Sequence, residues 1–177
     1  MNFPILSTVI FLPLLGSLFI FLSKNENNNK SHIYVSLFTS IANLFLSIFI
    51  CYSFDKYYLG FQFVEEHNWI SGFIKFKLGI DGISVLFINL TAFIVPICII
   101  SCINSVKERV KEFLIAILIL ETFMIGVFCS LDLVIFYLFF EAGLIPMFLI
   151  IGVWGGPKRV YSAFKFFLFT LLGSVLM

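Results

Sequence analysis

Charged residues are scarce in this sequence. Lysine, arginine, aspartate and glutamate make up 12% of its 177 residues, whereas they form about 25% of an ordinary soluble domain. Hydrophobic residues make up 61%, and the mean hydropathy is +1.11. This composition excludes an ordinary soluble domain and predicts a chain that lies in a membrane.

Basic clusters and cofactor motifs are absent too. The net charge is +1, and no Lys/Arg-rich stretch is interleaved with aromatic residues, so we expect no nucleic-acid partner. None of the four cysteines belongs to a CxxC pair, and no GxGxxG stretch is present. His32 and His67 lie outside the apolar runs, which favours solvated positions in loops. The sequence predicts no metal site and no redox centre in this chain.

Long apolar runs are what the sequence has instead. A helix needs about 20 mostly apolar residues to cross the roughly 30 Å hydrocarbon layer of a membrane. Five runs are long enough: residues 2–23, 33–54, 82–102, 113–130 and 133–154. A sixth begins near residue 163, but the residues after Lys165 reach only roughly 18 Å. We expect an all-α transmembrane bundle of five complete helices and a truncated sixth, from a fragment or a truncated gene.

Residues 55–81 are polar enough to lie outside the membrane. Apolar and polar residues alternate in FIKFKLGI, and Ser71-Gly72 separates two strand-like stretches, so we expect a small β-hairpin. Asp81 is placed to cap the helix that follows. The remainder is expected to form one transmembrane domain, so that residues 1–177 contain a single domain with an extramembrane hairpin.

The basic residues divide unequally between the two sides of the predicted bundle. One side has Lys56, Lys75 and Lys77, close to several acids. The other side has eight: Lys24, Lys30, Lys107, Arg109, Lys111, Lys158, Arg159 and Lys165. By the positive-inside rule, the side with eight faces the cytoplasm, or the matrix in a mitochondrion, and the N-terminus faces the opposite side.

Two glutamates stand inside the predicted spans, Glu121 in the fourth and Glu141 in the fifth. A charge at the bilayer centre costs about 2.5–3.5 kcal/mol on insertion scales, so such an acid usually faces protein or water and serves a proton or an ion. Burial disfavours the charged form of a carboxyl, which allows it to exchange a proton. The polar Asn43, Asn89 and Thr91 are expected to form hydrogen bonds between helices.

The residues around Glu141 favour it over Glu121 as the proton site. In YLFFEAGLIPMFLIIG, Pro146 leaves one backbone carbonyl beside Glu141 without its helical donor, and Gly143 leaves room for water. Tyr137 lies one turn earlier on the same face. The alternative for both acids is a neutral carboxyl that only links helices, and it carries more weight for Glu121.

The stretch CSLDLVIFYLFFEAGLIPMFLIIGVWGG, followed by KRVYSAFKFFLFTLLGSVLM, resembles the subunit M family of the proton-translocating NADH:quinone oxidoreductase. This enzyme is respiratory complex I, and the subunit is called subunit 4 in mitochondria. LGIDGIS, before the third run, is similar to the same family. The resemblance implies an antiporter-like, multi-pass subunit of the membrane arm, in a bacterial inner membrane or the mitochondrial inner membrane, with other membrane-arm subunits as partners.

The resemblance also implies roles for residues and cofactors. Glu141 matches the fifth-helix glutamate of the family, which pairs with a seventh-helix lysine that would lie beyond Met177. The family couples quinone reduction to proton pumping, while NADH, flavin, iron–sulfur clusters and quinone belong to partner subunits. Two alternatives stay open: a subunit of a multi-subunit cation/proton antiporter, and a membrane scaffold that does not pump. WGGPKRVYSAFKFFLFT favours the complex I subunit over the antiporter, and the effect of Glu141→Gln on activity would distinguish the scaffold.

The division of basic residues generates a topology prediction. We expect a cysteine introduced at Asn28 to be blocked by a thiol reagent confined to the cytoplasmic side, and one at Asn68 to react only from the outside. The measurement is labelling of intact and inverted vesicles. The reverse pattern would contradict the predicted orientation.

Overall fold

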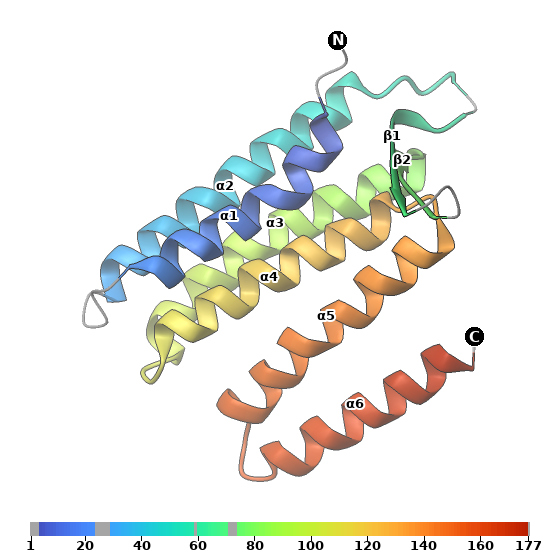
Figure 1. Cartoon of the computed structure of the whole chain (residues 1–177). Helices are drawn as coiled ribbons and strands as arrows, with labels where there is room; N and C mark the ends of the chain where they lie inside the picture. Colours follow the sequence, from blue (N-terminus) through green and yellow to red (C-terminus); the bar gives the residue numbers. More distant parts are fainter. Residues whose placement is uncertain (1–3, 24–28, 59, 71–73, 177) are drawn as a thin grey trace.

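The structure, a computed structural model, describes residues 4–23, 29–58, 60–70 and 74–176. Helices α1–α6 lie alongside one another, and a two-stranded hairpin covers one end of the bundle (Figure 1). The elements are α1 (Ile5–Leu22), α2 (Asn29–Ser53), β1 (Gln62–Ile70), β2 (Ile74–Ile80), α3 (Gly82–Ser105), α4 (Val110–Cys129), α5 (Leu133–Trp154) and α6 (Arg159–Val175).

Among the described helices, α1 to α5 are long and apolar enough to cross a membrane. This confirms the predicted all-α transmembrane bundle, and α5 begins and ends at the predicted residues. The segment 55–81 contains the antiparallel pair β1 and β2. The predicted turn at Ser71-Gly72 lies outside the described residues, as does Asn28.

The predicted position of His32 is wrong. His32 was expected in a solvated loop, but α2 already begins at Asn29, and His32 is 2% exposed. Because residues 29–32 (NKSH) are polar, the start of the helix could not be recognised from the apolar run that follows them. Helical spacing explains the burial, because a stripe of polar residues along α2 faces the inside of the bundle: His32, Ser36, Ser40, Asn43 and Ser47.

Helix α4 is the centre of the bundle. It packs against α1, α2, α3 and α5, whereas α6 packs only against α5 among the described elements. Small residues permit close approach: a Cβ added at Gly126 would lie 2.7 Å from the ring of Phe139 on α5. A polar side chain on α4 can therefore be kept away from lipid.

Carboxylates close the helix N-termini at the hairpin end. Glu65 of β1 accepts from the backbone N–H groups of Leu6 at 2.8 Å and Ser7 at 3.1 Å, and also from the Ser7 hydroxyl. Asp81 accepts from the Ser84 N–H at 2.7 Å, which confirms the predicted cap of α3 and lowers the pKa of Asp81. Asp132 caps α5 in the same way, at 2.8 Å from the N–H of Val134.

A lysine closes a helix C-terminus at the opposite end. Lys111 Nζ donates to the carbonyls of Phe21 at 3.2 Å and Ser23 at 2.8 Å, where α1 ends. A cation at this position satisfies free carbonyls and complements the negative end of the helix dipole. The two ends of the bundle thus differ in the sign of the charges that cap the helices.

The contacts of Glu65 generate a stability prediction. Glu65→Ala removes the acceptor for three donors at the start of α1, so we expect the free energy of unfolding to fall by about 1–2 kcal/mol. Unfolding of the purified chain in mixed detergent micelles measures this. Glu66→Ala is the control, because Glu66 makes an exposed ion pair with Lys77 at 4.0 Å and its loss should cost less than about 1 kcal/mol. Equal losses in the two variants would contradict the role of Glu65 as a cap.

Candidate functional site

Glu121 lies in the core of the bundle, where α4 faces α2. Its side chain is 1% exposed, and Asn43 Nδ2 donates to Glu121 Oε1 at 2.8 Å. Glu121 Oε2 and Asn43 Oδ1 have no hydrogen-bond partner within the described part of the chain. Because an uncompensated charge in such a place is costly, the arrangement suits a neutral acid next to an amide.

The polar stripe of α2 continues to α3. The hydroxyl of Ser47 lies 2.9 Å from Asn89 Oδ1 on α3. The prediction of hydrogen bonds between helices is therefore confirmed for Asn43 and Asn89. It is wrong for Thr91, whose hydroxyl donates to the Phe87 carbonyl of its own helix at 2.8 Å.

Glu141 lies in a more open place, between α5 and α6. Tyr137 Oη donates to Glu141 Oε1 at 2.5 Å, and the Ser174 hydroxyl of α6 lies 3.3 Å from the same oxygen. The predicted position of Tyr137 on the same face as Glu141 is thus confirmed. Tyr137 and Ser174 both line a groove of about 660 Å³ whose other walls are mainly apolar and include three phenylalanines.

The structure keeps the two predicted site residues apart. Glu121 lines a different cavity, of about 510 Å³, between α3, α4 and α5, together with Thr91, Cys98 and Met147. The hydrogen bond to the Glu121 carboxyl comes from Asn43 on α2, while those to the Glu141 carboxyl come from α5 and α6. Among the described residues, the two carboxyls therefore share no hydrogen-bond partner.

Sequence reasoning missed Ser174 as a partner of Glu141. The signal was a polar residue within an apolar run, the same signal that singled out Asn43, but the pairing of α5 with α6 was needed to connect it to Glu141. Among the described residues, no group of three or more His, Cys, Asp or Glu side chains could hold a metal ion.

The comparison with protein families decides the membership of the chain. Residues 7–127 match the family described as "NADH-ubiquinone oxidoreductase chain 4, amino terminus". The chain belongs to this family. Residues 130–177 match a second description, "NADH:quinone oxidoreductase/Mrp antiporter, TM". The resemblance seen in the sequence is confirmed.

Relatives in this family come from bacteria and plants. The chain is 50% identical over 176 residues to NADH-quinone oxidoreductase subunit M of Rhodobacter capsulatus, covering 98% of this chain and 34% of that protein. It is 48% identical over 174 residues to NADH-ubiquinone oxidoreductase chain 4 of Marchantia polymorpha, covering 97% of this chain and 35% of that protein. The chain thus spans about a third of the length of these relatives.

A solved structure has the same fold. It is a chain of the respiratory complex I from Thermus thermophilus with bound NADH, with a TM-score of 0.79 and 26% sequence identity. The match covers 96% of this chain and 33% of that chain. The arrangement of α1–α6 is therefore that of part of a chain from such a complex.

The buried pair generates a prediction about stability. Asn43→Leu and Glu121→Leu should each destabilise the bundle, while the double variant should lose less than the sum, because neither polar group is then left alone. We expect a coupling energy of about 0.5–1.7 kcal/mol, the range for hydrogen bonds between membrane helices. Unfolding in mixed micelles measures it. Strict additivity would show that the hydrogen bond does not link α2 to α4.

Proposed function

We propose that the chain forms part of a membrane-arm subunit of a proton-translocating NADH:quinone oxidoreductase, where it helps to couple quinone reduction to proton movement. The observation that carries the proposal is the match of residues 7–127 to the chain 4 family. The enzyme would lie in the inner membrane of a bacterium or a mitochondrion. NADH, flavin, iron–sulfur clusters and quinone would be bound by partner subunits, and this chain would contribute no redox centre.

Glu141 is the proposed proton-transfer and coupling site. Its Oε1 is contacted by two hydroxyls, those of Tyr137 and Ser174, that also line the α5–α6 groove. A hydroxyl both donates and accepts a hydrogen bond, so these groups can pass a proton between the groove and the carboxyl. The open groove also leaves a side from which the seventh-helix lysine implied by the resemblance can reach Glu141.

Glu121 is the weaker candidate. Its side chain is buried, and its hydrogen-bond donor among the described residues is the amide of Asn43, which is neither an acid nor a base. Within the described residues no hydroxyl contacts its carboxyl, so a proton leaving Glu121 has no obvious carrier. We propose that Glu121 mainly joins α2 to α4 and thereby supports the helix that packs against α5.

A second candidate function is proton exchange in a multi-subunit cation/proton antiporter. The observation that favours it is the match of residues 130–177, which carry Glu141, to a description that names the Mrp antiporter beside NADH:quinone oxidoreductase. The chain 4 match over residues 7–127 supports the oxidoreductase instead. Loss of quinone-dependent NADH oxidation on deleting the gene would distinguish the first from the second.

The proposed role of Glu141 predicts a large loss of pumping without loss of assembly. Glu141→Gln keeps the shape of the protonated acid but cannot release a proton, so proton translocation by vesicles should fall by about tenfold or more. Glu141→Asp should retain part of the activity, and Glu121→Gln should reduce it less than Glu141→Gln does.

Native gels supply the control for this experiment, because they show whether each variant complex assembles in the same amount as the unaltered one. Activities are then compared per assembled complex. Full proton translocation by the Glu141→Gln complex would show that this carboxyl only packs between α5 and α6, and the proposed role would be wrong.

A further inference from the structure

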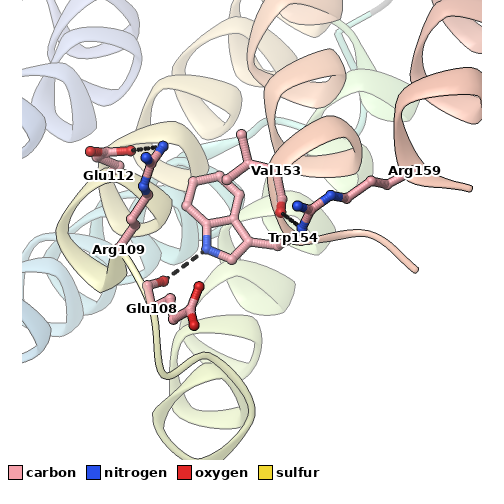
Figure 2. Close-up of polar contacts among 6 residues, drawn as sticks. All are labelled: Glu108, Arg109, Glu112, Val153, Trp154 and Arg159. Carbon is pink, nitrogen blue, oxygen red and sulfur yellow. Dashed lines mark hydrogen bonds and ion pairs between the residues drawn. The ribbon is translucent and has the colours of Figure 1, made fainter. Parts of the chain in front are cut away.

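A small polar cavity lies at the end of the bundle opposite the hairpin. It has a volume of about 280 Å³ and is formed where the α3–α4 connection meets the end of α5 and the start of α6 (Figure 2). Charged side chains and backbone share the lining, which consists of Glu108, Arg109, Gly152, Val153, Trp154 and Arg159. The cavity is separate from the surroundings of Glu121 and Glu141.

Two hydrogen bonds hold the walls of the cavity in place. Trp154 Nε1 donates to the Glu108 carbonyl at 3.0 Å, which ties the α3–α4 connection to the end of α5. Arg159 Nη1 donates to the Val153 carbonyl at 2.6 Å, which ties the start of α6 to the same place. The Trp154 ring also packs edge-on against Phe113, with 5.1 Å between the ring centroids. The Arg159 guanidinium keeps further N–H groups that these contacts do not use.

The cavity presents charges of both signs. Arg159 uses one N–H on Val153, and a guanidinium has five such donors. Arg109 makes only a loose ion pair with Glu112, at 3.8 Å between two largely exposed side chains. The Glu108 carboxylate has no hydrogen bond or ion pair within the described part of the chain, although both arginines line the same cavity. Two cationic donors and one anionic acceptor therefore remain for a ligand.

The position of the cavity indicates a lipid. It lies at the ends of membrane-spanning helices α4 and α5, beside Trp154, and tryptophan is enriched where a membrane meets water. Basic pockets between helices at this level are suited to lipid head groups. Guanidinium groups bind phosphate oxygens well, because their N–H groups match the spacing of those oxygens.

We propose that this cavity binds the head group of phosphatidylethanolamine. The lipid phosphate would accept from Arg109 and Arg159, and the primary ammonium would donate to the Glu108 carboxylate. Phosphatidylglycerol offers the same phosphate to the two arginines but has no ammonium, so the Glu108 carboxylate would stay unpaired, and the quaternary ammonium of phosphatidylcholine has no N–H to donate. The proposal does not depend on the proposed function, because it concerns only the attachment of the bundle to its lipid.

Quenching of Trp154 fluorescence tests the proposal. The chain has two tryptophans, so Trp69→Phe leaves Trp154 as the only reporter. The purified chain is placed in phosphatidylcholine vesicles with increasing fractions of phosphatidylethanolamine, phosphatidylglycerol or phosphatidylcholine that carries bromine on its acyl chains. We expect phosphatidylethanolamine to bind about two- to fivefold more strongly than the other two lipids, the range for exposed charge pairs.

Variants of the cavity assign the effect to its residues. Glu108→Gln should abolish the preference for phosphatidylethanolamine, and it leaves intact the backbone carbonyl that Trp154 contacts. The double change Arg109→Gln and Arg159→Gln should abolish the preference as well, because the phosphate is no longer anchored. The matched control is Lys107→Gln, which alters a charge on the same segment outside the cavity lining and should keep the preference.

Three results would overturn the proposal. These are equal quenching by all three lipids, stronger quenching by phosphatidylglycerol, and a preference for phosphatidylethanolamine that survives Glu108→Gln. A further arm adds millimolar inorganic phosphate to the vesicles. We expect the preference for phosphatidylethanolamine to remain, because free phosphate offers no ammonium to Glu108; loss of the preference would show that the arginines bind any phosphate and that the assignment to this lipid is wrong.

Discussion

Lipid offers no hydrogen-bond partner, so polar groups within the bundle must find partners inside the protein. The structure meets this constraint mainly through α4, which packs against four other helices and carries Glu121 to the amide of Asn43. The serines of α2 follow the same rule, since Ser36 and Ser40 return their hydroxyls to carbonyls of their own helix. The packing of α1 to α4 depends on this burial of polar groups.

The same constraint gives the two membrane glutamates different characters. Glu121 is buried between helices with one carboxyl oxygen bonded to an amide, so changing its charge would disturb the centre of the bundle. Glu141, the proposed proton-transfer site, has two hydroxyl partners on α5 and α6 that line a groove. A carboxyl that changes protonation state at low cost to the fold is better placed beside such a groove than in the core.

Much of this arrangement can be predicted from short stretches of the sequence. The spans, the hairpin and the Asp81 cap follow from apolar run length, alternation and a single capping residue, and each is found in the structure. Contacts between distant segments could not be predicted in this way. The hydrogen bonds of Glu65 with α1 and of Ser174 with Glu141 depend on which elements are neighbours in the fold. The spacing of residues along one segment does not contain this information. His32 was misplaced for a related reason, because its burial comes from the neighbours of α2.

The charges that cap the helix ends affect both the stability of the bundle and its predicted orientation in the membrane. Carboxylates close helix N-termini at the hairpin end through Glu65, Asp81 and Asp132, and Lys111 closes α1 at the other end. The unequal division of charge that predicts orientation is therefore partly a consequence of capping antiparallel helices. At the basic end, Arg109 and Arg159 are not used up by capping, because one makes a loose exposed pair and the other uses a single N–H. These two arginines are the groups that the proposed lipid contact uses.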